Sequence, residues 1–302
     1  MTATAQGPLT APRAAPAPPP RDDRVLPSTR WAALVLVAIL VPAVIVLWGA
    51  PGHTADLWSW TVAPDLTPIF LGSGYAAGAY FFWRTFRAER WHPSSAGVFS
   101  AAVFAGVMLI ATLISWEKFN HGDAPLLGAV AFYGWAVVYI AAPFAVIWLW
   151  LRNRRTDPRR PERTDAIVPG SVRRGAQLFA AAALVAATVF FVSPSIAIDV
   201  WPWTLTPLTA RVLASFAAQV GCGALLISLD PRWSGWRLLV QTFFVATAFL
   251  LVGAIREFGD FDQGNPLTWL YLAGLLVADL GLFLLYRTME TRRGEARSRA
   301  DG

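Results

Sequence analysis

The stretch DLWSWTVAP, residues 56–64, recurs in altered form as DVWPWTLTP at residues 199–207. An Asp, two Trp, a Thr and a Pro occupy the same relative positions in both stretches, which are 143 positions apart. Self-similarity of this kind at a fixed offset is typical of duplicated structural units. The sequence therefore predicts that the chain contains two copies of one unit.

The same offset aligns residues well outside the two stretches. Further along, the register drifts slightly, yet Glu117–Phe119 still faces Arg256–Phe258, and Pro125 faces Pro266. We expect the two copies at residues 30–152 and 173–288. The pairs at the offset of 143 include Arg30 with Arg173, Pro51 with Pro194, Trp58 with Trp201, Trp60 with Trp203, Pro64 with Pro207 and Gly78 with Gly221.

The composition indicates a membrane protein. Hydrophobic residues make up 56% of the chain and charged residues only 15%, too few polar side chains to cover a soluble globule. Eight apolar runs of about 20 residues are each long enough for a helix to cross a bilayer. They lie near residues 31–49, 67–86, 96–116, 125–151, 175–192, 207–229, 236–255 and 267–286.

These runs predict an all-α integral membrane protein with eight transmembrane helices arranged as two parallel four-helix repeats. An even number of crossings in each copy makes both copies enter the membrane in the same direction. The first run is then the counterpart of the fifth, which is internal, so we interpret it as a retained helix rather than a cleaved signal peptide.

The basic residues indicate the orientation. Of the 25 Lys and Arg, 22 fall in segments on one side of the predicted bundle, and Lys118, Arg211 and Arg256 fall on the other. This positive-inside pattern places both termini in the cytoplasm. It also attributes the basic pI to topology and to anionic lipids at the cytoplasmic face, and it excludes a nucleic-acid surface.

Three segments lie outside the predicted helices. We expect a disordered cytoplasmic N-terminal tail at residues 1–29, a basic cytoplasmic linker at residues 153–172 and a cytoplasmic C-terminal tail at residues 289–302. High Arg, Ala and Pro usage with a single Lys suggests a GC-rich bacterial genome, hence a multi-pass protein of the cell membrane.

The repeated loops allow two interpretations. Tryptophan favours the membrane interface, so these residues form an aromatic belt with the Asp as a turn residue, or the carboxylate and two rings bind a sugar or lipid headgroup. Thr206 before Pro207 is also a good helix start, and Thr67 with Pro68 is its counterpart. The loop residues are Asp56, Trp58, Trp60, Asp199, Trp201 and Trp203.

Small residues four positions apart predict close helix packing. Gly74 and Gly78 correspond to Ala217 and Gly221 at the same offset. Because small residues let backbones approach in lipid, the second and sixth helices are expected inside the bundle, with contact between them as one arrangement.

Searches for catalytic and metal-binding motifs find none. A single Lys and a single Cys, Cys222, exclude a phosphate-binding P-loop and a CxxC site. His53 and His121 share the predicted outer side with Asp56, Glu117 and Asp123, but their spacing fits no known ligand set. His92 is assigned to a loop. We therefore predict no cofactor and no metal, and the sequence leans against an enzyme.

Polar residues within the apolar runs carry the main functional hypothesis. Counting 1.5 Å per residue places Asp279, Gln219 and Gln241 at similar depths, and predicts an intramembrane cluster of the three. A carboxyl at that depth suits a proton relay or coupling site, or serves as a protonated link between helices. Nearer the outer surface, Arg211 and Glu257 are expected to form an ion pair, with anion recognition by Arg211 as the alternative.

Two classes of function remain open. A transporter or permease-like carrier fits the duplicated bundle and requires a polar cavity between the halves that reaches at least one face. A noncatalytic membrane scaffold, sensor or complex subunit fits the absence of motifs and requires a bundle closed through its middle.

Overall fold

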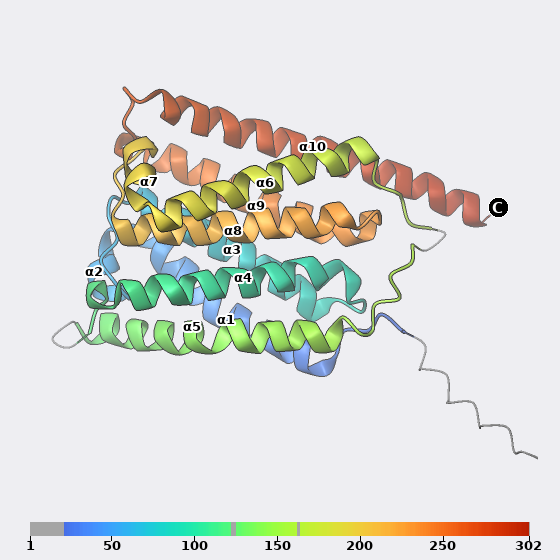
Figure 1. Ribbon diagram of the computed structural model, residues 1–302, viewed down its shortest axis with the longest axis horizontal. Helices are drawn as coiled ribbons and strands as arrows, with labels where there is room; N and C mark the ends of the chain where they lie inside the picture. Colours follow the sequence, from blue (N-terminus) through green and yellow to red (C-terminus); the bar gives the residue numbers. More distant parts are fainter. Residues whose placement is uncertain (1–20, 122–124, 162–163, 302) are drawn as a thin grey trace, which may run out of the picture.

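The computed structural model describes residues 21–121, 125–161 and 164–301 of the chain (Figure 1). Within these ranges the protein is helical and has no strand. Five short helical elements lie between the long helices in these ranges: α2 (Thr54–Leu57), α7 (Pro194–Val200) and 3₁₀ turns at Pro51–His53, Trp116–Lys118 and Phe258–Asp260. The long helices are α1 (Pro27–Gly49), α3 (Leu66–Arg87), α4 (His92–Ile114), α5 (Leu126–Asn153), α6 (Gly170–Val192), α8 (Pro207–Leu229), α9 (Trp233–Arg256) and α10 (Pro266–Asp301).

Seven helices in the described ranges are long and apolar enough to cross a membrane, as expected of a multi-pass membrane protein. The eighth long helix, α3, is not among the seven. It ends on Arg84 and Arg87, and more than half of its residues are buried against neighbouring helices. A helix that is enclosed by others does not need the apolar surface that lipid contact requires.

The long helices run side by side (Figure 1), and they differ in how much of their surface is buried. About half of the apolar window of α4 and α8 is buried, 50% and 56%, against 11% for α6 and α10. The outer helices instead expose large apolar side chains, such as Leu126 on α5, Leu178 on α6 and Val277 on α10. This distribution is expected when lipid is the solvent of the outer helices.

The helix contacts recur in pairs. Helix α1 packs on α3 as α6 packs on α8, and α4 packs on α5 as α9 packs on α10. Contacts between the two halves of the chain also occur as an equivalent pair, because α4 packs on α8 and α9 packs on α3. Helices α4 and α9 also contact each other.

One end of the bundle carries residues 21–26, residues 154–161 and 164–169 and the last turns of α10, and we call it the basic end (Figure 1). Backbone hydrogen bonds also recur there. In each half, the segment before the first long helix (α1 or α6) forms backbone hydrogen bonds with the residues at the start of the third long helix (α4 or α9). Val168 lies 143 positions after Val25, and Trp233 lies 142 positions after Trp91. The bonds are Val25 N–H to Glu89 O at 3.2 Å, Trp91 N–H to Asp23 O at 2.7 Å, Val168 N–H to Pro231 O at 2.9 Å and Trp233 N–H to Ala166 O at 2.9 Å.

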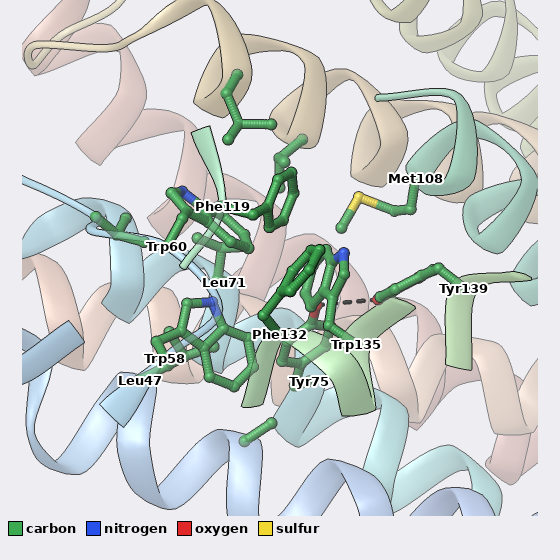
Figure 2. Packing of buried hydrophobic residues seen from close by; sticks show 14 of the residues in the cluster. Leu47, Trp58, Trp60, Leu71, Tyr75, Met108, Phe119, Phe132, Trp135 and Tyr139 are labelled. Carbon is green, nitrogen blue, oxygen red and sulfur yellow. Dashed lines mark hydrogen bonds between the residues drawn. The ribbon is translucent and has the colours of Figure 1, made fainter. Parts of the chain in front are cut away.

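At the opposite end of the bundle, the loop end, three of the four repeated tryptophans are buried. Trp58, Trp60 and Trp203 are 8%, 2% and 3% exposed. The first two pack against Phe119 and Trp135 (Figure 2). Trp201 and Trp203 form the corresponding cluster with Phe261 and Tyr271. Each loop therefore folds toward the bundle, and most of its tryptophan rings pack on neighbouring side chains.

The helix start at Thr206 is confirmed. Its side chain accepts from the Thr209 N–H at 3.2 Å, and Thr209 Oγ accepts from the Thr206 N–H at 2.7 Å. The proposed counterpart at Thr67 is wrong, because α3 begins at Leu66 and Thr67 Oγ instead accepts from Trp203 Nε1 at 2.9 Å. At the repeat offset of 143, the equivalent of Thr67 is Ala210, which has no hydroxyl group. Accordingly, Trp60 Nε1 has no hydrogen-bond partner among the described residues.

Both expected tails are partly structured. Residues 21–29 are anchored by Val25 and by Asp23, whose N–H donates to Thr156 O at 2.8 Å, and α1 begins at Pro27. Residues 289–301 continue α10 as a helix beyond its apolar part. The linker 153–172 also packs on the bundle, because Ala166 and Val168 are buried there. Residues 1–20, Asp123 and Gly302 lie outside the described residues.

The small residues pack within each half. A side chain at Gly78 would meet Leu40 of α1, and one at Gly221 would meet Leu184 and the backbone of α6. Gly74 makes room for the Phe216 ring of α8. Helices α3 and α8 therefore touch through Phe216, while the stripe of small residues receives the first helix of each half. Ala217 on α8 is half-buried.

Candidate functional site

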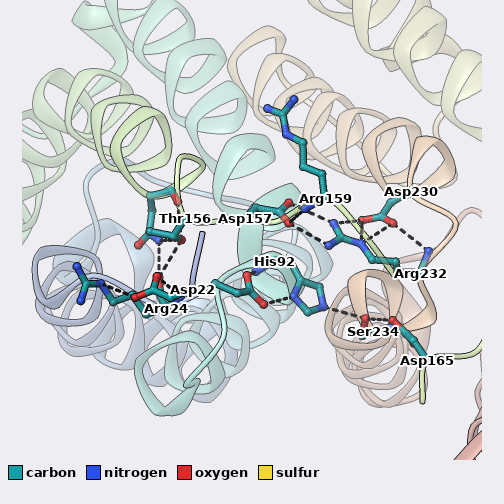
Figure 3. A network of polar contacts seen from close by, with 12 residues as sticks. Asp22, Arg24, His92, Thr156, Asp157, Arg159, Asp165, Asp230, Arg232 and Ser234 are labelled. Carbon is teal, nitrogen blue, oxygen red and sulfur yellow. Dashed lines mark hydrogen bonds and ion pairs between the residues drawn. The ribbon is translucent and has the colours of Figure 1, made fainter. Parts of the chain in front are cut away.

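A chain of polar side chains joins the N-termini of α4 and α9 at the basic end (Figure 3). His92 is the first residue of α4, and its Nδ1 contacts an Asp23 carboxylate oxygen. Its Nε2 lies 2.8 Å from Ser234 Oγ in the first turn of α9, and Ser234 Oγ donates to Asp165. Four residues from both halves of the chain thus form one continuous hydrogen-bonded row.

The order Asp23, His92, Ser234 matches the connectivity of a hydrolytic triad. Two contacts favour a different role. The Ser234 hydroxyl has one proton, and its hydrogen bond to Asp165 directs that proton away from His92. Each carboxylate also accepts a backbone N–H from the start of its helix, Asp23 from His92 at 3.0 Å and Asp165 from Ser234 at 3.2 Å. The row therefore caps two helices and ties them together.

A buried arginine supports this junction from the side. Arg232 is 6% exposed and binds Asp157 through two nitrogens at 2.9 and 3.2 Å, and Asp230 at 2.7 Å. Burial opposes ionisation of Asp157, but hydrogen bonds and the charge of Arg232 outweigh it, so the pKa of Asp157 lies below its ordinary value. Burial lowers the pKa of Arg232, yet its two carboxylate partners raise it above the ordinary value.

Beside the junction lies a polar cavity of about 620 Å³, which we call the arginine cavity. It is lined by α3, α4, α9, α10 and the linker, and therefore by both halves of the chain. Arg84, Arg87 and Arg297 are exposed at its wall, so the cavity opens at the basic end. Its six arginines are Arg84, Arg87, Arg90, Arg237, Arg293 and Arg297.

The cavity extends along α9 as far as Gln241, two turns above the helix start. Gln241 Oε1 accepts from Tyr80 at 3.1 Å, and its Nε2 donates to the Tyr286 hydroxyl at 3.0 Å. Arg84 donates to the Tyr80 hydroxyl at 2.9 Å. These bonds fix polar groups from α3, α9 and α10 at the inner limit of the cavity.

The predicted intramembrane cluster does not form. Asp279 accepts a hydrogen bond from Thr247 of α9, which suits a link between helices and leaves Asp279 outside the arginine cavity. Gln241 has the partners described above, and Gln219 lines a separate cavity within the first half. Thr247 lies six residues beyond Gln241 on α9, about 9 Å along the helix, so Asp279 and Gln241 differ in depth as well as in their neighbours.

The predicted ion pair between Arg211 and Glu257 is also replaced. Glu257 pairs with its neighbour Arg256 at 2.9 Å. Arg256 additionally donates to Trp48 O at 2.6 Å, at the end of α1. Arg211 Nε is buried without a hydrogen-bond partner among the described residues.

The loop residues proposed for ligand binding do not converge. Asp56 and Asp199 are exposed, whereas the tryptophans of the same two loops are mostly buried, each loop in its own cluster. Within the described ranges, no group of three His, Cys, Asp or Glu side chains has the arrangement of a metal site.

The sequence reasoning missed His92, Ser234 and the arginine cavity. The apolar run begins only near residue 96, so the sequence places His92 in a loop, whereas α4 begins at His92, four positions earlier. A usable signal existed: the dipeptide Arg90–Trp91 recurs as Arg232–Trp233, and places His92 opposite Ser234. No family model, curated protein or solved structure matches the chain.

Proposed function

We propose that the protein is a permease-like carrier of the cell membrane that binds a multivalent anion in the arginine cavity. In this proposal the chain crosses the membrane eight times, with α3 as the additional crossing. It forms two parallel four-helix repeats, at residues 30–152 and 173–288. The basic end faces the cytoplasm, next to anionic lipids.

One observation carries the proposal: six arginines from both halves of the chain line a single cavity that opens at one end of the bundle. Positive charge on the cytoplasmic side is a general property of membrane proteins. Convergence of arginines on one cavity is not a general property of membrane proteins. The guanidinium group of arginine is well suited to bind phosphate or carboxylate oxygens.

The recurrence of contacts supports the tandem repeat. The pairs α1–α3 and α6–α8, α4–α5 and α9–α10, and α4–α8 and α9–α3 follow from one two-fold axis along the membrane normal. The α4–α9 contact lies where that axis would run. In a carrier, rocking of one repeat against the other at this contact would open or close a cavity between them.

A carrier of this kind requires a polar cavity between the halves that reaches one face, and the arginine cavity has these properties. The loop end is filled by the two aromatic clusters, so the described conformation is open only toward the basic end. A sensor that binds an anion without moving it is the second candidate, favoured by the hydrogen-bonded row that ties α4 to α9.

Binding is tested by thermal unfolding of the purified protein in the presence of inorganic phosphate, pyrophosphate, sulfate or citrate. A ligand at about 100 times its Kd stabilises the folded state by about 2.7 kcal/mol. We expect at least one multivalent anion to raise the Tm, and the shift to shrink as NaCl is added. Uptake of that anion into proteoliposomes then distinguishes a carrier from a sensor.

The matched variants are Arg293→Gln, inside the cavity, and Arg292→Gln, exposed on the next position of α10. Loss of one charge-assisted contact is expected to weaken binding about tenfold in Arg293→Gln only. Equal anion responses of both variants and the wild type would contradict a site in this cavity, and binding without uptake would contradict the carrier.

A further inference from the structure

A second cavity, of about 370 Å³, lies within the first half of the bundle, away from the arginine cavity. Its walls come from α1, α3, α4 and α5, with Phe216 and Gln219 contributed by α8. Among the described residues, no charged side chain lines it. Its volume falls within the range of about 300–1,000 Å³ that is usual for small-molecule sites. A cavity of this character is suited to a neutral, largely apolar ligand.

Aromatic rings form much of the wall. Trp58, Tyr75 and Trp135 lie close together, with ring centroids 6.3 Å apart for Trp58 and Tyr75 and 5.7 Å apart for Trp58 and Trp135 (Figure 2). Phe104 and Phe216 continue this wall, with centroids 4.7 Å apart. Offset and edge-on contacts with several rings favour a flat ring in the ligand.

Two polar groups in the cavity have unused hydrogen-bonding capacity. The hydroxyls of Tyr75 and Tyr139 are 3.0 Å apart, so one donates to the other and the second proton remains available (Figure 2). Gln219 lies midway along α8, and its amide makes no hydrogen bond to the described residues. A polar group without a partner is costly at this depth, which favours a ligand that carries acceptors.

The tyrosine pair is not needed to build the fold. At the repeat offset, Tyr75 corresponds to Ala218 in α8, and α8 packs on α6 as α3 packs on α1. Aligning Pro125 with Pro266 places Leu280 at the position of Tyr139. Two hydroxyls that only one half possesses indicate a role specific to this cavity.

The cavity is accessible from the side of the bundle. Ile39 on α1 is 40% exposed, and Gly134 on α5 is exposed, and both line the cavity. These surfaces face the lipid in a membrane-spanning bundle, so the ligand enters from the bilayer rather than from water.

We propose that this cavity binds the head of a membrane-dissolved quinone. The aromatic wall packs on the flat ring, and the carbonyl oxygens accept from the free tyrosine hydroxyl and the Gln219 amide. The apolar tail leaves between α1 and α5 into the bilayer. This inference is independent of the anion site.

The test uses the full chain in lipid nanodiscs and a naphthoquinone with a short prenyl tail. Quenching of tryptophan fluorescence is expected to saturate with wild type. Tyr139→Phe and Gln219→Leu each remove one hydrogen bond and are expected to raise the Kd about three- to tenfold. Tyr133→Phe is the control, because Tyr133 is 59% exposed on the same helix and does not line the cavity.

A further variant keeps every hydrogen bond and fills the entrance. A side chain at Gly134 would meet no atom within 4 Å, so Gly134→Leu is expected to fold normally and to abolish saturable quenching. Unsaturable quenching in the wild type, or equal Kd values in wild type, Tyr139→Phe, Gln219→Leu and Gly134→Leu, would overturn the proposal. Arg293→Gln should bind the quinone like wild type, which separates failure of this site from failure of the anion site.

Discussion

Arg232 lies almost entirely out of solvent, and its charge is balanced by two carboxylates from different segments. Asp230 is two residues away in sequence, whereas Asp157 comes from the linker and joins it to the start of α9. Removing one partner of a buried ion pair costs more than the pair contributes, because a charge is left without compensation. The residue therefore ties the linker to the bundle.

We predict that Asp157→Asn lowers the free energy of unfolding by about 2–4 kcal/mol, less than full loss of a buried pair because Asp230 remains. Thermal unfolding in detergent measures the change. Asp22→Asn is the control: its carboxylate pairs with Arg24, but both side chains are at least half exposed, and the change should be within about 1 kcal/mol of zero.

The same pair sets an acid limit to stability. Because the pKa of Asp157 is lower in the folded protein than in an unfolded chain, its contribution is complete above the unfolded pKa of about 4. It is lost as the pH falls through the folded value. Asp157→Asn should therefore differ from wild type at pH 7 and converge with it below pH 4. A constant difference across this range would contradict the assignment.

The sequence determined neither the relative depth nor the direction of the polar side chains within the helices, because Asp279 bonds to Thr247, six residues along α9 from Gln241. Counting along each helix placed Asp279, Gln219 and Gln241 at one level, since rise per residue is nearly constant. Which neighbour each side chain meets depends on the rotation of its helix, and the packing turned Asp279 toward Thr247 and Gln219 into the first half. The arginine cavity required the same knowledge, because its arginines come from distant segments.

Among the helices, the predicted and observed bounds agree best at the loop end. The predicted run 207–229 coincides with α8, where Thr206 supplies the cap and Pro207 the first turn. At the basic end α4 begins four residues before the predicted run, and α10 continues fifteen residues beyond it. Apolar runs mark the part of a helix within lipid, and polar extensions into water carry no such signal.

The close packing between helices yields a prediction for the small residues at these contacts. Gly221→Leu would bring a Cβ to 2.9 Å from Leu184 Cγ and 3.1 Å from its backbone nitrogen, so overpacking should lower stability by about 1–3 kcal/mol or more. Gly78→Leu meets only the tip of Leu40 at 3.3 Å and should cost less. Gly106→Leu on α4 meets nothing within 4 Å and serves as the control.

Thermal unfolding of these variants should rank them with Gly221→Leu lowest and Gly106→Leu closest to wild type. If Gly78→Leu were the most destabilised, the packing of α3 on α1 would be closer than described. If all three matched wild type, close packing of the first and second helices of each half would be refuted.

For the whole molecule, the duplicated stretch predicted more than any single motif. It predicted that α1 corresponds to α6 and α3 to α8, and the contacts α1–α3 and α6–α8 are both present. It did not reveal that the loops fold inward, because tryptophan suits both an interface and a protein interior and the sequence cannot separate them. The two cavities proposed as binding sites lie where the two halves differ or meet, and a repeat pattern does not specify such places.

We propose that the cavity between the two halves is open to the cytoplasm. Cys222 is the only cysteine, so a Cys222→Ser background carrying Gln241→Cys holds one thiol at the inner limit of the arginine cavity. Phe244→Cys, at similar depth but 40% exposed on the bundle surface, is the control.

Labelling with a membrane-impermeant maleimide, in inside-out and right-side-out vesicles, tests this claim most directly. We predict that Gln241→Cys reacts only in inside-out vesicles, and that Phe244→Cys, surrounded by lipid, reacts in neither. Reaction of Gln241→Cys from the right-side-out face, or from neither face, would contradict the account.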